Sequence, residues 1–458
     1  MFTRDVYFLK MGCVVMQLQE FHYATLEEII KDAEDQGIEL SFSRDFGLFT
    51  KKLEVNGITI PNSLAIHPME GCDGTFDGRP DELTKRRYVR FAQGGAGLIW
   101  FEAVAVVPEG RANPRQLWIH NDNLSDFQKL SNDISQNACK TVGKGFRPVR
   151  IMQLTHSGRF SKPQGRSVPV IAYSNPYLDT AMKVAEDIPI ITDSELERLE
   201  EQFEAAAILA QKAGFDGVDI KCCHRYLNSE LLAGFTRKGR YGETFEGRTR
   251  FLLNIIDRIK SRLGNSFIVT TRMNIYDGIP FPYGWGTDKE DYRKVDLEEP
   301  KKLVAILYNK SVGIVNLTMG TPYYNPHVNR PYDKGEYVPE ERPLTGVARL
   351  INGIGEVQKA VPDMVVVSTG YSWMRQFAPY LAAGSLENGL AKMIGFGREA
   401  FAYPDYAKDI LSGASMKKEK CCIACGKCTQ IMRAGGTAGC VIKDAGVYAP
   451  LYKQYCLK

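Results

Sequence analysis

Cysteines crowd the end of this 458-residue chain and form its most chemically specific pattern. Six of the 11 cysteines follow residue 420, and the run Cys422-Ile-Ala-Cys425-Gly-Lys-Cys428 is followed by Cys440 after eleven residues. Three thiolates so close together let one loop wrap a compact cluster, while a distant fourth thiolate closes it. The spacing predicts a [4Fe-4S] site with Cys422, Cys425, Cys428 and Cys440 as ligands.

Other readings of these cysteines stay open. Zinc also accepts four thiolates, although structural zinc usually pairs two separated CxxC knuckles. Disulfides are disfavoured because no secretion signal precedes the chain. Cys421 could replace Cys422 as the first ligand in an alternative spacing; Cys422 is preferred because it keeps the CxxC step. Cys456 is expected to be a bystander in the tail.

A second group of reactive side chains stands where candidate β-strands end. They are His67-Pro68-Met69-Glu70 after the first candidate strand, Gln153 and His156 at the end of the third, Lys221 to Tyr226 after the fourth, and Arg272 at the end of the fifth. Active sites of barrels lie at the carboxyl ends of the strands, so these positions are where chemistry is expected.

Glycine-rich turns follow the last two candidate strands. Gly370-Tyr371 ends the seventh and Gly397-Arg398 the eighth. Loops after strands seven and eight of a barrel commonly hold a phosphate with backbone amides and a basic side chain. We therefore expect a phosphate-bearing cofactor there, although a glycine near a strand end is more often only turn geometry.

The elements that must position these residues recur in a regular order. Eight short apolar or β-rich runs are candidate strands, at 64–67, 97–101, 149–154, 217–221, 267–272, 313–317, 364–368 and 392–395. Segments with helical period lie between them, most clearly at 193–213 and 245–263. Alternating strands and helices form a parallel sheet, and eight such units close a (β/α)8 TIM barrel. An open doubly wound sheet is the rival arrangement.

The rest of the chain frames this barrel. A short capped helix is expected from Thr25 to Gly37. Composition shifts after Pro404 through a small and basic run into the cysteine segment. We expect an N-terminal extension over residues 1–50, a barrel over 51–405 and a cluster-binding segment over 406–458.

Composition limits the class of function. The charged fraction is 24% and the apolar fraction 44%, which is typical of a globular protein with a large core. The formal net charge of +4 gives no broad field for nucleic acid or anionic lipid. No apolar run is long enough to span a membrane, and no signal peptide precedes the barrel. These features predict a cytoplasmic protein without nucleic-acid or membrane partners.

Several motifs together resemble the Old Yellow Enzyme family of FMN-dependent oxidoreductases. They run from Pro61 to Cys440 in the order PNSLAIHPM, GGAGLIWFE, QLTHSGR, AGFDGVDI, RKGRYGETFEGRTRF, GFGREAFAYPD and CIACGKC. Within the family, the chain is most similar to the branch with a [4Fe-4S] cluster, typified by 2,4-dienoyl-CoA reductase and trimethylamine dehydrogenase. The resemblance implies FMN and a [4Fe-4S] cluster as cofactors.

The resemblance also implies roles around the flavin. Gln153 would bond the pyrimidine edge of the flavin, and Arg272 would lie near N1, where a fixed cation favours the anionic reduced form. Pro68 and Met69 would lie against the flavin. The FMN phosphate would be bound by Gly370, Tyr371, Gly397 and Arg398.

The turn after the fourth strand would carry the proton chemistry. Many family members have a histidine, two small residues, a His or Asn, a further residue and a Tyr. Here the turn reads Lys221-Cys-Cys-His224-Arg-Tyr226, so a lysine replaces the first histidine. By resemblance, Lys221 and His224 would bind a substrate carbonyl and Tyr226 would deliver a proton. A full charge on Lys221 should change the substrate preference.

Four further residues are weaker candidates for substrate contacts. His156 lies in the QLTHSGR motif, while Tyr323, Tyr324 and His327 lie in the loop after the sixth strand, which could roof the substrate. For each of the aromatic and histidine candidates, ordinary packing is the bland alternative.

The resemblance implies an enzyme acting on CH–CH groups. We expect hydride transfer from flavin N5 to the β-carbon of an unsaturated carbonyl compound and protonation at the α-carbon. The chain lacks a GxGxxG strand–helix unit and continues only 18 residues past Cys440, so no attached FAD or NAD(P)H domain is expected. The electron donor would be a separate ferredoxin, flavodoxin or flavoprotein, or NAD(P)H directly, in an anaerobic cytoplasm.

Two other functions and the oligomeric state remain open. The flavin could run oxidatively, as in the demethylation of methylated amines, with Tyr323 and Tyr324 as an aromatic cage, although Lys221 would repel such a cation. The chain could also be an electron-transfer subunit of a larger complex. The sequence does not decide between a monomer and a homo-oligomer.

Overall fold

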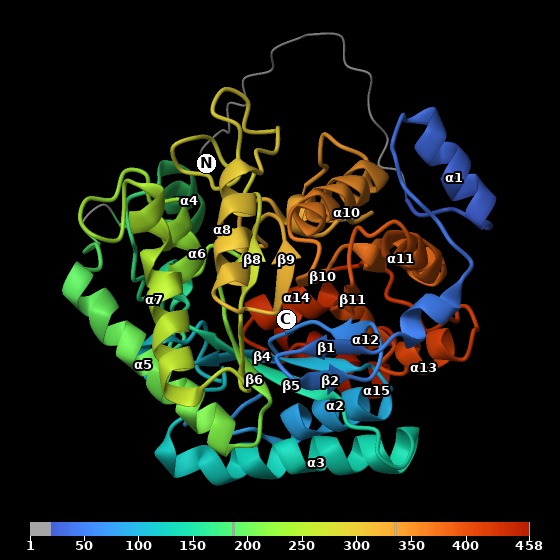
Figure 1. Cartoon of the computed structure of the whole chain (residues 1–458), viewed down its shortest axis with the longest axis horizontal. Coiled ribbons are helices and arrows are strands. Elements are labelled where there is room, and N and C mark those ends of the chain that lie inside the picture. The colour runs from blue at the N-terminus through green and yellow to red at the C-terminus, as the bar shows by residue number, and fades with distance from the viewer. Residues whose placement is uncertain (1–19, 186–187, 334, 336, 458) are drawn as a thin grey trace.

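A parallel barrel forms the centre of the molecule. The computed structural model describes residues 20–185, 188–333, 335 and 337–457, and the part of the expected N-terminal extension at residues 1–19 lies outside this range. The barrel is surrounded by helices, as Figure 1 shows. The strands are β3 (Leu64–Ile66), β4 (Leu98–Ala105), β5 (Val149–Thr155), β6 (Gly217–Ile220), β7 (Ile268–Thr270), β8 (Arg272–Asn274), β9 (Ile314–Thr318), β10 (Val365–Ser368) and β11 (Met393–Phe396).

These strands form one ring of parallel pairs. Their order is β7-β6-β5-β4-β3-β11-β10-β9-β8. Only Thr271 separates β7 from β8, so the two are parts of one barrel strand: β7 pairs with β6, and β8 pairs with β9. A bridge between Cys222 and Met273 joins the end of β6 to β8. The predicted (β/α)8 barrel is confirmed against the open sheet, and the strand expected over 267–272 is interrupted at Thr271 and continues to Asn274.

A hairpin that the sequence analysis did not predict precedes the first barrel strand. It consists of β1 (Leu53–Val55) and β2 (Ile58–Ile60), which are antiparallel. The turn residues Asn56 and Gly57 have φ of 52° and 77°, the left-handed pair that a tight hairpin turn requires. Leu53, Val55 and Ile60 pack with inward-facing residues of the barrel strands in one buried apolar cluster. The hairpin therefore extends the core inside the barrel.

The helices cover the outside of the ring. The longer ones are α1 (Leu26–Asp35), α2 (Glu82–Gln93), α3 (Leu124–Val142), α5 (Asp193–Lys212), α7 (Phe245–Leu263), α8 (Glu298–Asn309), α10 (Pro343–Ala360), α11 (Ala378–Glu387) and α15 (Ala445–Cys456). Shorter ones are α4 (Pro176–Met182), α6 (Leu227–Leu232), α9 (Pro326–Asn329), α12 (Arg398–Ala402), α13 (Tyr406–Leu411) and α14 (Lys427–Arg433). Short 3-10 turns lie at Phe46–Thr50, Pro108–Gly110, Asn121–Asn123, Gly158–Phe160 and Tyr371–Phe377.

The periodic segments form helices for the expected reasons. In α5, Thr192 and Glu195 form a capping box, and the buried face includes Leu196, Leu199 and Phe203, three and four residues apart as the periodicity requires. In α1, the Thr25 hydroxyl accepts a hydrogen bond from the Glu28 amide, which satisfies a free N–H of the first turn. None of the helices in the described part of the chain is long and apolar enough to cross a membrane.

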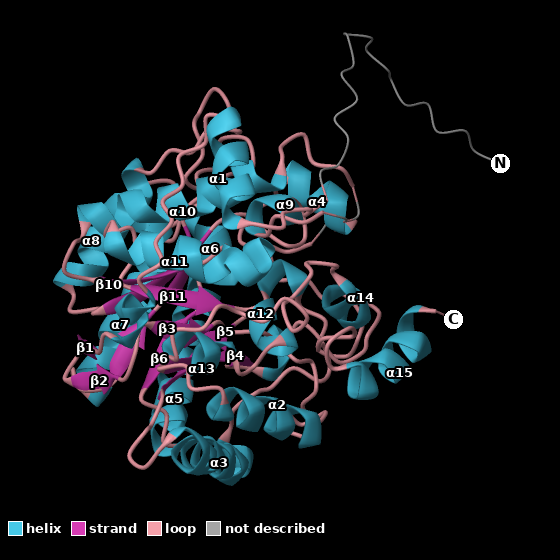
Figure 2. Ribbon diagram, turned by 90° about the vertical axis from the view of Figure 1, so that its right-hand side faces the viewer, coloured by secondary structure: helices cyan, strands magenta, loops and turns pink. Residues whose placement is uncertain are grey.

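The C-terminal segment packs against the barrel next to α2 and α12 (Figure 2). Asp444, just before α15, binds Arg86 at 2.7 Å and also Arg90, both on α2. The Ala438 amide donates to the Gly71 carbonyl at 2.7 Å, so the segment also contacts the loop after β3. These contacts hold the cysteines at the carboxyl end of a barrel strand.

Candidate functional site

One cavity opens at the carboxyl ends of the barrel strands and has a volume of about 190 Å³. It brings together many residues that the sequence predicted, among them Pro68, Met69, Gln153, Lys221, His224, Tyr226, Arg272, Tyr323, Gly370, Gly397 and Arg398. Residues that the sequence analysis did not place there also line it, including Asn329, Arg330, Ser372 and Trp373. Cys422 and Cys428 line the same cavity, which therefore reaches from the barrel to the cysteine segment.

Gln153 is held in position from inside the barrel. Its Nε2 donates to Oδ2 of Asp219 on β6 at 2.6 Å, and Trp100 Nε1 donates to the same oxygen at 2.7 Å. The Arg272 amide donates to the other Asp219 oxygen at 2.7 Å. Burial raises the pKa of Asp219 to about 6, while these hydrogen bonds oppose the rise. With one amide hydrogen fixed, the remaining polar atoms of Gln153 can serve a ligand in the cavity.

Arg272 places a positive charge in the middle of the cavity wall. Its side chain is buried, and its Nε has no hydrogen-bond partner among the described residues. Burial lowers the pKa of Arg272, and the nearby Cys223 and Asp219 oppose this. A buried guanidinium with an unpaired donor is costly unless a ligand completes it.

Two more arginines lie at the end of the cavity formed by the loops after β10 and β11. Arg398 follows Gly397, and Arg330 comes from the loop after β9. The buried Nε atoms of both, and Nη1 of Arg330, lack partners in the described part of the chain. Burial, followed by the charge of Arg398, lowers the pKa of Arg330 to about 9. Gly370 at φ 114° allows the backbone to approach the cavity there.

Tyr371 does not line this cavity. Its side chain is buried, and its hydroxyl donates to Ser368 Oγ at 3.0 Å. The ring packs against Phe396 on β11, with ring centroids 6.1 Å apart. Any contact of this residue with a phosphate would therefore have to come from its backbone.

A chain of polar contacts links the loop after β3 with the turn after β6. Lys221 Nζ lies 2.8 Å from Oε1 of Glu70, and the Tyr226 hydroxyl donates to the same oxygen at 3.2 Å. The Tyr226 and Tyr323 hydroxyl oxygens are 3.1 Å apart. Lys221 Nζ also lies 3.7 Å from the centroid of the Tyr226 ring. Burial first, and then Glu70 and Tyr323, raise the pKa of Tyr226, so its proton is firmly held.

The turn between Lys221 and Tyr226 has an unusual backbone. His224 and Arg225 have φ of 62° and 61°, a region that costs energy for residues other than glycine. Arg225 is fully buried and pairs with Asp277 at 2.7 Å, which offsets that cost by anchoring the turn. His224 Nε2 lies 3.3 Å from Asn329 Nδ2. Burial, together with Arg272, lowers the pKa of His224, so its imidazole is neutral at neutral pH.

Three of the four weaker candidates lie outside the cavity lining. His156 is buried and accepts a hydrogen bond from the Gly158 amide at 3.1 Å. His327 contacts the Tyr337 hydroxyl, and Tyr324 packs edge-on against Tyr177. Only Tyr323 lines the cavity, where its ring stacks on Phe160 with centroids 3.9 Å apart.

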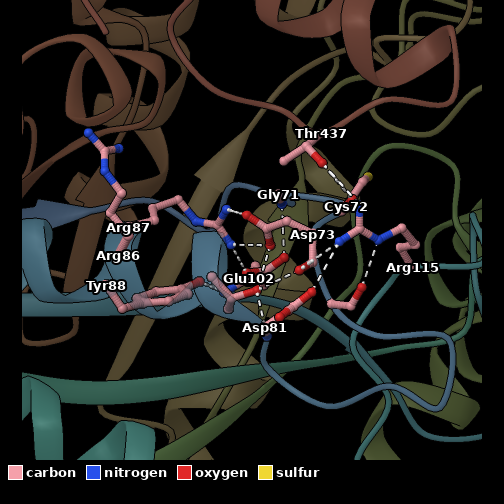
Figure 3. A network of polar contacts seen from close by, with 12 residues as sticks. Gly71, Cys72, Asp73, Asp81, Arg86, Arg87, Tyr88, Glu102, Arg115 and Thr437 are labelled. Atoms are coloured by element: carbon pink, nitrogen blue, oxygen red, sulfur yellow. Dashed lines mark hydrogen bonds and ion pairs between the residues drawn. The ribbon is translucent and has the colours of Figure 1, made fainter. Parts of the chain in front are cut away.

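A buried ionic network supports the loop that carries Glu70, as Figure 3 shows. Arg87 on α2 pairs with Asp73 and with Glu102 on β4. Glu102 Oε2 accepts a hydrogen bond from the Gly71 amide at 2.9 Å, next to Glu70. Burial raises the pKa of Glu102 to about 7, although Arg87 opposes this. The network fixes the backbone of the loop rather than entering the cavity.

The four predicted cysteine ligands line a second, smaller cavity of about 20 Å³. Cys421 does not line it, and its thiol donates to the Lys417 carbonyl instead. Among the described residues, no three His, Cys, Asp or Glu side chains stand close enough together to hold a single metal ion. The ligands of a [4Fe-4S] cluster bind different iron atoms, so they lie farther apart than those of a mononuclear site.

The two cavities share a wall. Arg398, Phe401, Cys422 and Cys428 line both of them. Glu399 accepts hydrogen bonds from the Cys422 amide at 3.1 and 3.2 Å, and burial raises the pKa of this carboxyl to about 8. A group bound by the cysteines would thus adjoin a ligand in the large cavity.

Comparison with known proteins agrees with this geometry. The sequence model of the NADH:flavin oxidoreductase / NADH oxidase family matches residues 48–294. NADH oxidase from Thermoanaerobacter brockii is 26% identical over 412 residues, which are 87% of this chain and 56% of that protein. The chain thus spans about half the length of this relative.

Solved structures show the same barrel. A 2-naphthoyl-CoA reductase complex has a TM-score of 0.67 at 18% identity, covering 87% of this chain and 57% of that one. Histamine dehydrogenase from Rhizobium sp. 4-9 has a TM-score of 0.66 at 18% identity, covering 87% of this chain and 52% of that one. At such identities the likeness concerns the fold.

Proposed function

The chain belongs to the NADH:flavin oxidoreductase / NADH oxidase family and is an oxidoreductase, and from this premise we propose that it reduces the activated double bond of α,β-unsaturated carbonyl compounds. The observation that carries the proposal is the group of donors on one side of the large cavity: Lys221 Nζ, the Tyr226 hydroxyl and the imidazole of His224. A carbonyl oxygen that gains negative charge needs N–H donors, and the carbon next to it needs an acid.

FMN, the cofactor of the family, fits the large cavity. Buried donors without partners surround it, namely the Nε atoms of Arg272, Arg330 and Arg398. We propose that Arg330, Arg398 and the backbone around Gly370 and Gly397 hold the phosphate, and that Gln153 and Arg272 bind the pyrimidine edge of the ring. When bound, FMN supplies the hydride at N5.

The thiols around the smaller cavity are the donor set that a [4Fe-4S] cluster requires. Four thiols line this cavity, and burial raises the pKa of Cys422 and Cys440, so these thiols would stay protonated without a cation to bind. We propose Cys422, Cys425, Cys428 and Cys440 as the ligands and residues 406–458 as the segment that holds them. When bound, the cluster supplies electrons one at a time. Arg398 and Phe401 separate the two sites.

Lys221 and His224 would bind the carbonyl oxygen of the substrate. The neutral imidazole of His224 and the ammonium of Lys221 can both donate to an oxygen that becomes enolate-like. Glu70 holds Lys221 Nζ at 2.8 Å and so fixes where the ammonium lies. The Glu70 carboxylate also offsets the positive charge that Lys221 brings into the cavity, so the substrate meets an ion pair rather than an isolated cation.

Tyr226 would protonate the α-carbon. Its O–H proton moves to carbon and leaves a phenolate, which Lys221 Nζ, 3.7 Å from the ring centroid, stabilises. Tyr323 can donate a hydrogen bond to that oxygen across 3.1 Å. The proton is then restored from solvent through these groups, with Glu70 as an acceptor at 3.2 Å.

The test is Tyr226→Phe in the holoenzyme with 2-cyclohexenone as substrate. A lost general acid costs about 10²–10⁴-fold in turnover, while 2-cyclohexenone binding to oxidised enzyme should change little. A nitroalkene is the matched control substrate, because hydride addition to it gives a stable nitronate that needs no acid at carbon. Equal turnover of 2-cyclohexenone by Tyr226→Phe and the parent enzyme would remove Tyr226 from the mechanism.

A second function is oxidation of an amine, with electrons leaving through the cluster. Two observations favour it: the barrel of histamine dehydrogenase is similar, and the Glu70 carboxylate beside the rings of Tyr226 and Tyr323 could hold an ammonium group. Anaerobic mixing separates the functions. Bleaching of oxidised FMN by histamine or trimethylamine supports amine oxidation, and reoxidation of reduced FMN by enones supports the reductase.

A further inference from the structure

Positive charge is concentrated in the cysteine segment. Residues 412–458 contain eight of the 58 Lys and Arg residues but only two of the 54 Asp and Glu residues. The rest of the chain therefore has slightly more acidic than basic residues. One of the two acidic residues, Asp444, pairs with Arg86 and Arg90 of α2, and two of the basic residues, Lys417 and Lys420, pair with Asp409 and Asp405 just before the segment. The segment thus presents a local positive field on a protein that is nearly neutral overall.

Two of these lysines stand at the wall of the cysteine cavity. Lys427 and Lys443 line it together with Ile442, and all three are at least partly exposed. Lys443 Nζ donates to the Glu419 carbonyl at 2.5 Å, and Lys427 Nζ lies 5.3 Å from the centroid of the Tyr452 ring. Neither lysine forms an ion pair with a carboxylate of the described residues. No direct carboxylate contact therefore neutralises either charge, although Lys443 also acts on the buried Glu399 carboxyl and lowers its pKa.

An exposed apolar residue lines the same cavity as the two lysines. Ile442 is 37% exposed, one of the few large hydrophobic side chains at the surface of the described chain. Cys425 and Cys440, which line the cavity beneath, are themselves partly exposed. An apolar centre with a charged rim is the composition of a transient protein interface, where the charges steer the encounter and the apolar contact excludes water.

We propose that Lys427, Ile442 and Lys443 form the docking surface for an acidic one-electron carrier protein. This inference rests on the proposed function, because it takes the cysteines to hold the cluster. Each carrier molecule gives up one electron, which the cluster gains, so two docking events deliver the two electrons that one double bond consumes. Together with one proton these two electrons make up the hydride, and a second proton goes to the α-carbon. Because these three residues line the same cavity as the four cysteines, a carrier docked on them would lie next to the cluster.

The experiment measures binding rather than turnover. The probe is an acidic [2Fe-2S] ferredoxin, titrated into the holoenzyme by calorimetry at several salt concentrations. The variant Lys427→Glu/Lys443→Glu should weaken binding by at least about tenfold at low salt and flatten its salt dependence. The control Lys129→Glu/Lys140→Glu changes the net charge equally on exposed positions of α3 and should leave the affinity within about twofold.

Further arms keep the result unambiguous. The iron content of the Lys427→Glu/Lys443→Glu variant shows whether it retains its cluster. If the charge reversal removes the cluster, Lys427→Gln/Lys443→Gln takes its place and should show a smaller loss of ferredoxin affinity in the same direction. Ile442→Ala should weaken binding without changing the salt slope. Equal loss in the α3 control, or no loss at Lys427 and Lys443, would overturn the proposal. Ferredoxin binding as expected with no reduction of any enone would refute the proposed function and leave the docking surface standing.

Discussion

Replacement of Arg330 by methionine should weaken FMN binding much more than riboflavin binding. The Nε and Nη1 atoms of Arg330 are buried and have no partner among the described residues. A hydrogen bond to a charged group contributes about 1.5–3 kcal/mol, so two bonds to a phosphate amount to about 3–6 kcal/mol. The dissociation constant of FMN should therefore rise by about 10²–10⁴-fold in Arg330→Met.

The assay is the quenching of flavin fluorescence when the apoprotein is titrated with FMN or with riboflavin. Riboflavin lacks the phosphate but shares the ring, so it reports any general damage to the cavity. Its affinity should stay within a few-fold of the parent protein's value. If FMN and riboflavin lose affinity equally, or if FMN loses none, Arg330 does not bind the phosphate.

Although Arg330→Met should weaken FMN binding, it should make the apoprotein more stable. Burial and the nearby Arg398 lower the pKa of Arg330 to about 9, which means that the folded state disfavours its charge. A group of this kind destabilises the fold at every pH below its unfolded pKa, so the penalty is fully present at neutral pH. Arg330→Met should therefore raise the melting temperature of the apoprotein. Inorganic phosphate should raise it more for the parent protein than for the variant at the same concentration.

Three further predictions concern the other groups. Glu70→Gln removes one cause of the raised pKa of Tyr226, so this pKa falls and the alkaline limb of the pH–kcat profile for 2-cyclohexenone should move to lower pH. Cys428→Ser should lose bound iron and sulfide in chemical analysis, whereas Cys456→Ser, outside the cysteine cavity, should keep both. Arg225→Ala removes the ion-pair partner of the buried Asp277 carboxylate, which should cost about 3–5 kcal/mol in the free energy of unfolding by urea titration; Arg225→Ala/Asp277→Ala should recover part of it.

Most of the barrel could be predicted because its signals are local. Each barrel strand is a short buried run, and α5 and α7 show the helical period over 19 or 20 residues. The β1–β2 hairpin escaped prediction because its strands are only three residues long, too short for an alternating pattern to show. Its Asn56-Gly57 turn was the available signal. The break at Thr271, where pairing with β6 gives way to pairing with β9, is equally invisible in the sequence.

Residues of the site could be predicted only where their position along a strand determines the direction in which their side chains point. Residues at strand ends such as Gln153, Lys221 and Arg272 face the cavity because barrel strands carry their ends to one edge. In the loops, position along the chain does not predict where a side chain points. Tyr371 follows Gly370 immediately, yet its side chain turns into the core, and Arg330 reaches the cavity from a loop in which Tyr324 and His327 turn away. Such choices depend on packing partners distant in sequence.

The pairing of Lys221 with Glu70 shows what sequence alone leaves out. The two residues are 151 positions apart, and each looked ambiguous by itself: the lysine as an added charge beside the flavin, the glutamate as one of several polar residues in the first loop. In the fold, Lys221 Nζ lies 2.8 Å from Glu70 Oε1, and the hydrogen bond from the Gly71 amide to Glu102 fixes the loop that carries Glu70. A lysine can stand in this cavity because a carboxylate from another strand end neutralises it. The double variant Glu70→Gln/Lys221→Met should therefore perturb the turnover of 2-cyclohexenone less than the sum of the single variants, and additive effects would show that the two charges act independently.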